Sequence, residues 1–343
     1  MKDVNSLRIV YMGTPEFAVA PLAKLLNAGY NVVAVITAPD KPSGRGKKIH
    51  YSAVKQFVLD KNLDSEANPE ANPETNPGQP LLLLQPENLK DPGFVNELSG
   101  LQPDLQVVVA FRMLPKVVWQ IPRLGTCNLH ASLLPQYRGA APINHAIMNG
   151  ESITGVTTFM IDEKIDTGNI LLQKKTTIGE TDTAGELHDR LMILGATLVL
   201  ETVNRLVSGR LEALSQESFS TGEAELMHAP KINKDLRHIS WDQPGTNVNN
   251  LIRGLSPSPA AFSFLNRSEA KKVLFKIFSS AFEVAAHTEP PGTIRSDGKN
   301  FLKVAVRDGY ITLHSVQQEG KRRMDIGEFL AGFNLVSGPH WFS

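Results

Sequence analysis

The strongest constraint on the fold is a set of short, nearly continuous apolar runs separated by helical patterns. Residues 7–11 and 31–37 are two such runs, and between them apolar side chains recur at helical spacing. A strand, a helix and a second strand of this length form a βαβ unit, which places both strands parallel in one sheet. Residues 105–110, almost wholly apolar, are typical of a strand covered on both faces. We therefore expect an α/β protein with a doubly wound, mostly parallel sheet.

Capping and turn residues delimit the other elements of this sheet domain. Thr14 and Ser52 are expected to be helix N-caps, and Thr183 with Glu186 forms a capping box that opens a long helix. Further strands are expected at 81–84, 126–129, 153–161 and 169–177, and helices at 15–27, 52–62, 92–99, 142–149 and 183–208. The first domain is thus predicted over 1–209, with a low-complexity insertion at about 64–80 in which Asn-Pro recurs.

The pattern changes beyond the first domain. Residues 210–227 are polar with little periodicity and predict a linker. Short strand-like runs follow, and Asp308-Gly309 between the last two is a hairpin signal. Strands are expected at 261–265, 273–278, 301–306 and 310–316, with helices at 246–255 and 325–333. A second domain is therefore predicted over 228–343, and its expected fold is a smaller OB-like β-barrel.

The composition is that of an ordinary globular protein. The chain has 343 residues, of which 41% are hydrophobic and 20% charged, and no apolar run approaches the roughly 20 residues that a membrane span needs. We expect a cytoplasmic protein. The single cysteine, Cys127, excludes an internal disulfide and predicts a buried structural thiol. No Cys/His cluster has the spacing of a zinc site, so no metal is expected.

The charge is balanced overall but unevenly spread. A formal net charge of zero argues against a general nucleic-acid binder. Residues 229–343 carry 15 Lys and Arg against 10 Asp and Glu, and the residues before them carry 20 against 25. This imbalance fits contact with a polyanion on one face, although a chance fluctuation of a few charges explains it nearly as well.

Three polar side chains of different chemistry mark a candidate site. Asn128 and His130 stand two residues apart where a strand ends, so both project to the same side. Asp166 lies on a turn beyond the run 156–161, and it reaches the same place if that run pairs beside the first strand. An amide donor, an imidazole and a carboxylate suit acyl transfer to an amine. A structural histidine and an ordinary Asp-x-Gly turn remain open alternatives.

Two common nucleotide-binding motifs are absent. Gly13 stands alone after the first strand, so the Gly-x-Gly-x-x-Gly fingerprint of dinucleotide-binding domains is missing. The basic loop at 38–48 contains no Gly-Lys-Ser/Thr that opens a helix, so it is not a P-loop. By its residues alone, this loop is a solvated surface loop.

Several ordered motifs resemble those of the 10-formyltetrahydrofolate-dependent formyltransferases, over residues 8–342. They are Asn128-Leu-His130, Ser132-Leu-Leu-Pro135, Arg138-Gly-Ala-Ala-Pro142, Gly155-Val-Thr157 and Asp166-Thr-Gly168. The resemblance implies that Asn128, His130 and Asp166 are catalytic. It also implies that Ser132, Leu133, Leu134 and Pro135 form part of the folate site. Phe111, Arg112 and Met113 stand where the family usually has a tyrosine and a glycine, and we expect them to line the pterin region.

The likeness is strongest to family members that formylate the methionine carried by initiator tRNA. In those enzymes a similar loop enters the acceptor arm, which implies that Arg45 is the key tRNA contact and that Lys41, Lys47 and Lys48 face phosphates. The family's C-terminal barrel also contacts tRNA. Candidates there are Lys231, Lys234, Arg253, Lys271, Lys272, Lys276, Lys321, Arg322 and Arg323.

The resemblance therefore implies formyl transfer from 10-formyltetrahydrofolate to methionyl initiator tRNA. Formylation of glycinamide ribonucleotide shares the site chemistry, but an enzyme for that reaction would be a single domain, whereas two domains are predicted. Formylation of an amino sugar nucleotide gives no reason for a basic loop at Arg45. Hydrolysis of formylfolate, with water in place of the amine, is an alternative from another class, and a non-catalytic RNA-binding protein is a further one. The expected partners are folate and initiator tRNA, and we expect a monomer.

Overall fold

The computed structural model describes residues 7–43, 48–61, 63, 81–219, 225–268, 271–332 and 340–343. The Asn-Pro insertion predicted at about 64–80 lies outside these residues. Two compact units are present. The first contains 1–138, 155–176 and 189–227, and the second contains 139–154, 177–188 and 228–343. Among the described residues, no helix is long and apolar enough to cross a membrane.

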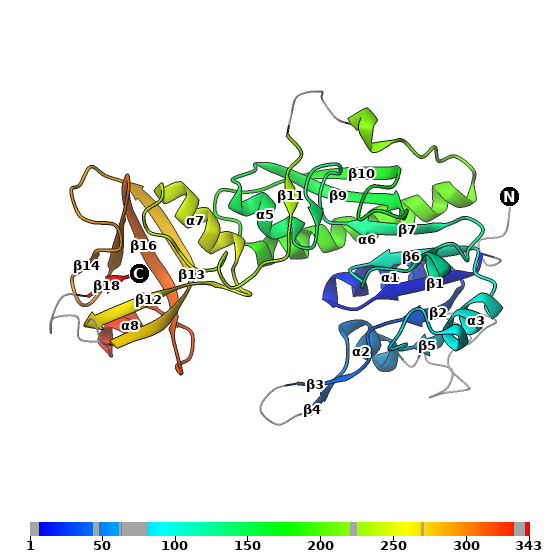
Figure 1. Cartoon of the computed structure of the whole chain (residues 1–343), viewed down its shortest axis with the longest axis horizontal. Helices are drawn as coiled ribbons and strands as arrows, with labels where there is room; N and C mark the ends of the chain where they lie inside the picture. The colour runs from blue at the N-terminus through cyan, green and yellow to red at the C-terminus, as the bar shows by residue number, and fades with distance from the viewer. Residues whose placement is uncertain are drawn as a thin grey trace. The chain divides into compact units, whose positions relative to one another are not determined.

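The first unit is built on a seven-stranded sheet with the order β10-β9-β7-β6-β1-β2-β5 (Figure 1). β1 pairs in parallel with β2 and β6, β2 with β5, and β6 with β7, whereas β9 is antiparallel to β7. The strands are β1 (Ile9–Gly13), β2 (Val32–Ile36), β5 (Leu82–Leu84), β6 (Leu105–Val109), β7 (Thr126–His130), β9 (Ile153–Met160) and β10 (Ile170–Thr177). The predicted mostly parallel sheet is confirmed, and so is the pairing that brings the segment before Asp166 beside β7.

Helices cover both faces of this sheet. Phe94 and Leu98 of α3 and Val118 of α4 pack in one core cluster with Val10 and Val108. On the opposite face α6 packs against β7, since an added Cβ at Gly195 would lie 2.7 Å from Leu129. The helices of this unit are α1 (Val19–Asn27), α2 (Ala53–Asp60), α3 (Pro92–Gly100), α4 (Lys116–Trp119) and most of α6 (Ala184–Val207), with one-turn 3-10 helices η2 (Glu16–Ala18) and η3 (Gln216–Phe219), whereas α5 (Pro142–Met148) belongs to the second unit. The short α4 was not predicted. The fold is doubly wound, as expected.

Two of the three expected helix caps form. Ser52 Oγ accepts a hydrogen bond from the backbone N–H of Lys55, and Thr183 and Glu186 bond to each other reciprocally. Thr14 is not a cap, because the chain after β1 enters η2 through Pro15 without a side-chain cap. The turn is tight there, since an added Cβ at Gly13 would lie 2.5 Å from the Ala18 Cβ. Thr14 is therefore part of the turn rather than of a helix terminus.

The second unit contains an antiparallel sheet with the order β14-β15-β16-β13-β12-β18, and β17 pairs with β16. Its two edges meet, because Thr293 bridges to Trp341 and the Phe342 N–H donates to the Gly292 carbonyl at 3.0 Å. The elements are α7 (Gly245–Gly254), β12 (Ala261–Ser268), β13 (Lys271–Val284), β14 (Ile294–Ser296), β15 (Leu302–Val306), β16 (Gly309–Gln318), β17 (Met324–Asp325), α8 (Ile326–Ala331) and β18 (Trp341–Phe342). This nearly closed barrel confirms the OB-like prediction.

Short pairings complete the structure. The predicted hairpin at Asp308-Gly309 forms, with Val306 opposite Gly309. The strands β14, β17 and β18 were not predicted, because two or three residues give no measurable alternation. Two further two-stranded pairs were also not predicted: β3 (Lys41–Ser43) with β4 (Lys48–His50), and β8 (Arg138–Gly139) with β11 (His228–Ala229).

Cys127 is buried in β7, as the sequence predicted. Burial raises the pKa of its thiol to about 12, and only the thiolate is an effective nucleophile. We expect the folded protein to resist alkylation by iodoacetamide at about pH 8, where an ordinary thiol with a pKa of about 8.5 reacts readily. Intact mass spectrometry should find a single adduct only after unfolding in guanidinium. An adduct that forms on the folded protein as fast as on a free cysteine peptide would contradict this burial.

Candidate active site

The structure brings His130 and Asp166 together at the carboxyl end of β7. His130 is the last residue of this strand and is 6% exposed. Asp166 lies on the loop between β9 and β10, and its Oδ2 is 3.8 Å from His130 Nδ1. An imidazole and a carboxylate are thus neighbours at the edge of the sheet where parallel strands end, which is where ligands bind in open α/β sheets.

A backbone carbonyl orients the His130 ring. Nε2 lies 2.8 Å from the Tyr137 carbonyl oxygen. Because a carbonyl can only accept, Nε2 carries the hydrogen and Nδ1 is the nitrogen that faces Asp166. A separation of 3.8 Å is too long for a hydrogen bond. The printed hydrogen bond that orients the His130 ring is therefore the one to the Tyr137 carbonyl.

Asn128 projects from the same side of β7 as His130. It lies opposite Val108 of β6, whose side chain belongs to the core cluster with α3 and α4. Asn128 is half-buried, and within the described part of the chain its side chain has no hydrogen-bond partner. The side-chain amide can therefore donate to an oxygen of a bound substrate.

Three residues around this edge have left-handed backbone conformations. The φ angles are 47° at Ala110, 60° at Tyr137 and 55° at Asp166. For residues other than glycine such angles cost of order 1–3 kcal/mol each and persist only where the surroundings impose them. Ala110 directly follows β6, Tyr137 supplies the carbonyl that accepts from His130, and Asp166 carries the acid. The strain is thus concentrated where the polar side chains meet.

Hydrogen bonds to neighbouring protein groups hold the segment Ser132–Pro135 in place. Ser132 Oγ donates to the Gln136 carbonyl at 2.6 Å, and the Leu134 N–H donates to Thr157 Oγ1 at 3.1 Å. Gln173 Nε2 donates to the Leu134 carbonyl at 2.8 Å. Ser132, Leu134 and Pro135 are buried and Leu133 is half-buried. The first three side chains therefore define the shape of the loop instead of lining an open surface.

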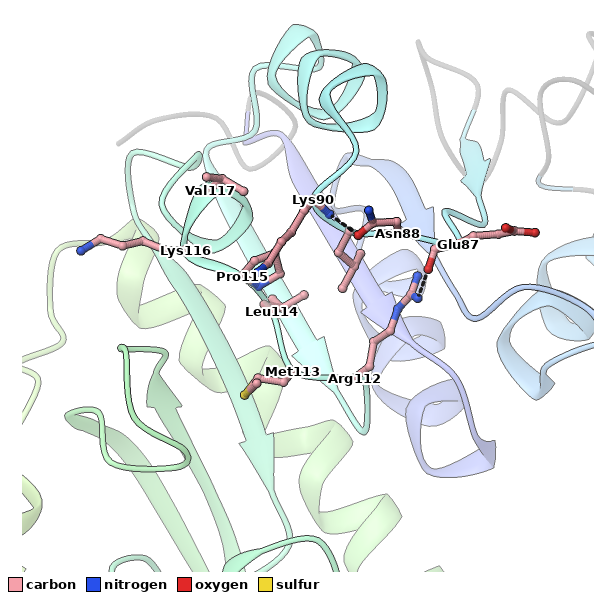
Figure 2. Close-up of a pocket in the computed structure, with 10 residues that line it drawn as sticks. Glu87, Asn88, Lys90, Arg112, Met113, Leu114, Pro115, Lys116 and Val117 are labelled. Carbon is pink, nitrogen blue, oxygen red and sulfur yellow. Dashed lines mark hydrogen bonds between the residues drawn. The ribbon is translucent and has the colours of Figure 1, made fainter.

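A cavity of about 810 Å³ opens at the ends of β5 and β6 (Figure 2). This is within the range of small-molecule sites. Its lining residues are Glu87, Asn88, Leu89, Lys90, Arg112, Met113, Leu114, Pro115, Lys116 and Val117. The cavity thus includes two of the three residues expected in the pterin region. The third, Phe111, packs against the core and lies 5.5 Å from the Arg112 guanidinium.

Arg112 is the charged group that reaches across this cavity. Its Nη1 donates to the Glu87 carbonyl at 2.7 Å and its Nη2 donates to the Pro86 carbonyl, as Figure 2 shows in part. Its Nε is buried and has no hydrogen-bond partner among the described residues. Burial lowers the pKa of the guanidinium, which is the electrostatic cost of a cation with no paired anion. Met113, in contrast, is 78% exposed.

The flanks of the predicted basic loop pair with each other as β3 and β4. Lys41 is exposed in β3. Arg45 and Lys47 lie outside the described residues, and Lys48 is described only as a member of β4. The base of the hairpin is fixed: Lys55 Nζ is 2.6 Å from Asp40 Oδ2, and Gln85 Nε2 is 2.8 Å from Asp40 Oδ1. The residue directly before β3 is therefore held by two side chains of the first unit.

The basic residues expected to contact tRNA in the second unit differ in surroundings. Arg253 is committed internally, because its Nη1 donates to the carbonyls of Gly179 and Asp182. Arg322 pairs with Glu328, with Nη2 and Oε1 2.9 Å apart. The side chains of Lys231, Lys234, Lys272, Lys321, Arg322 and Arg323 are exposed, Lys276 is half-buried, and the side chain of Lys271 is not among those described.

Sequence reasoning missed the roles of three residues at this site. Tyr137 acts through its carbonyl, which no sequence pattern reveals. Thr157 belongs to a recognised motif, but its hydrogen bonds to the 132–134 segment require coordinates. Gln216 lies in the predicted linker and donates to the carbonyls of Asp166 and Gly168, both at 2.9 Å. No motif or periodicity singles out this glutamine.

Comparison with known proteins agrees with this geometry. Residues 7–203 match the formyl transferase family and residues 231–334 match the formyl transferase C-terminal domain. The methionyl-tRNA formyltransferase of Bacteroides thetaiotaomicron is 51% identical over 334 residues, which are 97% of this chain and 98% of that protein. The enzyme of the same name from Bacteroides fragilis is 52% identical over 332 residues, or 97% of each chain.

Solved structures agree on the fold. An N-formyltransferase from Helicobacter canadensis, in complex with folinic acid and dTDP-3-aminofucose, superposes with a TM-score of 0.61 at 18% identity. The match covers 93% of this chain and 100% of that one. At this identity the likeness carries the architecture alone. From its sequence relatives and its two matched domains, the chain belongs to the formyltransferase family and, within it, to the methionyl-tRNA formyltransferases.

Proposed function

We propose that the protein transfers the formyl group of 10-formyltetrahydrofolate to the amino group of methionine on initiator tRNA. The observation that carries this proposal is the pairing of His130 and Asp166 on the edge of the sheet that also opens into the cavity. The high identity to methionyl-tRNA formyltransferases supports the choice of acceptor. Since aminoacylated tRNA is used in translation, the cytoplasm is the corresponding site of action.

The reaction requires an amine to attack the formyl carbon. A carbon–nitrogen bond forms, the formyl oxygen becomes an oxyanion, and the bond from carbon to the folate nitrogen then breaks. In this proposal Asn128 donates a side-chain N–H to the developing oxyanion. Nδ1 of His130, when protonated, is the second donor, because Nε2 is occupied by the Tyr137 carbonyl. Donors that are fixed before the reaction stabilise such charge without reorganisation.

In this proposal Asp166 takes part in proton transfer. The attacking amine must lose a proton and the departing folate nitrogen must gain one. Asp166 Oδ2, 3.8 Å from His130 Nδ1, stabilises the ring when it is charged. The two groups together can accept the proton from the amine and return it to the leaving nitrogen. The chain needs no nucleophilic serine or cysteine of its own, because the acceptor amine is the nucleophile.

The cavity beside Arg112 fits the folate donor. A reduced folate combines a flat ring system with a glutamate tail, and the cavity combines apolar side chains with the half-buried guanidinium of Arg112. Of the cavity-lining residues, all of which the structure describes, Arg112 has a buried Nε with no partner in the described chain, so a carboxylate of the tail would satisfy it. Met113 would contact the donor from the rim. The 132–135 segment would act on the donor through the shape of its loop, with Leu133 as its more accessible side chain.

The tRNA would be held by the basic hairpin and by the barrel. Lys41, Arg45, Lys47 and Lys48 lie on or between β3 and β4, and we propose that Arg45 makes the main contact with the acceptor arm. The exposed lysines and arginines of the second unit would contact phosphates. Arg253 is excluded from this group by its internal hydrogen bonds. We further propose that the catalytic domain spans 1–209 and that the tRNA-contacting domain spans 228–343.

The alternative acceptors are less well supported. An amino sugar nucleotide has only a distant counterpart in the Helicobacter canadensis enzyme, at 18% identity. Hydrolysis of the donor requires that water replace the amine, and nothing in the arrangement of Asn128, His130 and Asp166 favours water over an amine. An assay that offers several acceptors to one labelled donor separates these activities.

The acceptor assay uses a labelled formyl donor with charged initiator tRNA, charged elongator tRNA or an amino sugar nucleotide. Label should pass to initiator methionyl-tRNA and to neither competitor. Arg45→Glu should lower kcat/KM for tRNA about tenfold or more and should reduce the salt-dependence slope by about 1, without a change in donor binding. The matched control is the charge reversal Lys24→Glu, at an exposed position of α1. Release of labelled formate without any acceptor would instead identify a hydrolase.

The three proposed catalytic side chains can be tested singly in this assay. Asn128→Ala and His130→Ala should each lower kcat by about 10²–10³, the usual loss when one oxyanion donor is removed. Asp166→Ala should lower kcat by about 10²–10⁴, the usual contribution of a proton-transfer group. Each variant should still fold, as judged by thermal unfolding. His314→Ala, at an exposed position of β16, is the control and should keep normal turnover. A residue whose loss leaves turnover near normal has no part in the mechanism.

The assignment of Arg112 predicts a specific loss of donor affinity. Arg112→Met should raise the dissociation constant of 10-formyltetrahydrofolate about tenfold or more, because one charge-assisted contact is typically stronger than about 1.5 kcal/mol. A donor analogue that ends at the pteroate carboxamide carries no glutamate. It should therefore bind wild type and variant alike, as measured by fluorescence titration. Equal losses for both donors would mean that Arg112 acts on the loop through the Pro86 and Glu87 carbonyls.

A further inference from the structure

Gln216 uses every hydrogen-bonding position of its side chain. It begins η3 and is 4% exposed. Its Nε2 donates to the carbonyls of Asp166 and Gly168, both at 2.9 Å. Its Oε1 accepts from Arg138 Nε at 3.1 Å and from Arg138 Nη2 at 2.7 Å. A glutamine amide has two N–H donors and two lone pairs, so this one is saturated.

The two ends of this bridge belong to the two halves of the candidate site. Asp166 carries the carboxylate that faces His130, and its backbone is in the left-handed region. Arg138 directly follows Tyr137, whose carbonyl accepts from His130 Nε2. Gln216 therefore joins the segment that orients the imidazole to the loop that carries the acid.

The Asp166 loop depends on such outside support. Gly168 runs against β9 so closely that an added Cβ would lie 1.7 Å from the Met160 carbonyl oxygen. Just beyond the loop, Leu214 and Ile170 exchange backbone hydrogen bonds at 2.8 and 2.9 Å. The chain from Leu214 to Gln216 is thus fastened along the loop, first by its backbone and then by the Gln216 amide.

We propose that Gln216 is a positioning residue for formyl transfer, which sets the place of the Asp166 carboxylate relative to the His130 imidazole. Gln216 acts through the backbone of Asp166 and Gly168 and through Arg138, not on the reacting atoms. It lies between the two matched family domains, at 7–203 and 231–334. This inference rests on the proposed function, because it gives Gln216 a role in that same reaction.

Two substitutions, each with a side chain about as long as that of glutamine, distinguish the hydrogen bonds to the Asp166 loop from those to Arg138. Gln216→Glu keeps an acceptor for Arg138 but removes both donors and sets a carboxylate against two carbonyls. Gln216→Met removes all four hydrogen bonds. If the donors to the Asp166 loop matter, both variants should lose about 10–100-fold in kcat, since displacement of about 1 Å costs of that order. KM for tRNA and for donor should stay within about twofold, because the ground-state contacts remain.

The control is Gln102→Glu, which adds the same charge at an exposed position ahead of β6. It should leave kcat unchanged. Thermal unfolding and donor binding at the Arg112 cavity are measured for every variant, so that a folding defect is seen directly. A variant that binds donor normally but turns over slowly has lost positioning rather than structure.

A double-mutant cycle supplies the decisive readout. Gln216→Glu is combined with Asp166→Ala, and kcat is compared in both backgrounds. If Gln216 acts through the acid, its substitution should cost less than about threefold once the carboxylate is gone, because residues that act as a unit are not additive. A residue with a general structural role would cost the same in both backgrounds.

The outcomes separate this inference from the proposed function. Normal kcat in Gln216→Glu and Gln216→Met, with Asp166→Ala still impaired, overturns the positioning role and leaves the mechanism intact. Additive losses in the double-mutant cycle overturn it as well. Normal turnover in Asp166→Ala would instead contradict the mechanism itself.

Discussion

The hydrogen bond from His130 Nε2 to the Tyr137 carbonyl decides what the site can do. It fixes both the ring orientation and the position of its hydrogen, and so directs Nδ1 toward Asp166. The bond depends on the left-handed turn at Tyr137, and that turn is tied by its own N–H to the Met227 carbonyl at 2.7 Å. An imidazole buried without this partner would be free to rotate, and neither the acid nor the acceptor amine would meet a defined nitrogen.

The sheet explains why one edge gathers all of these groups. β5, β2, β1, β6 and β7 are parallel, so all five place their carboxyl ends at one edge of the sheet. The segments after β5 and β6 line the cavity there, and β7 ends at His130. β9 runs back beside β7, and the loop after it returns Asp166 to the same edge. The cavity at Arg112, the side chains of Asn128 and His130, and the Asp166 loop are therefore brought near one edge of the sheet. Hydrogen bonds with Thr157, Gln173 and Gln216 then fix the 132–135 segment and the Asp166 loop, whose conformations strand order alone does not determine.

Patterns that extend over whole strands and helices predicted the fold well. Individual tertiary contacts could not be predicted from the sequence. Apolar runs gave the strands β1, β2, β6 and β7 because burial on both faces leaves a visible pattern. Asn128 and His130 were placed on one side by simple alternation. Thr14 failed as a cap because the close approach of Gly13 to Ala18 depends on tertiary packing. Tyr137 acts through its backbone and Gln216 from a polar segment, so neither leaves a signature in side-chain chemistry.

A crystal structure of the protein with 5-formyltetrahydrofolate, a stable relative of the donor, tests the central claim most directly. The measured quantities are the distances from the folate to Asn128 Nδ2, His130 Nδ1 and the Arg112 guanidinium. The account predicts the ring system in the cavity, the tail carboxylate on Arg112, and the formyl group beside Asn128 and His130 at hydrogen-bonding distances of about 2.7–3.2 Å. A folate bound elsewhere, or one whose formyl group points away from His130, would contradict it.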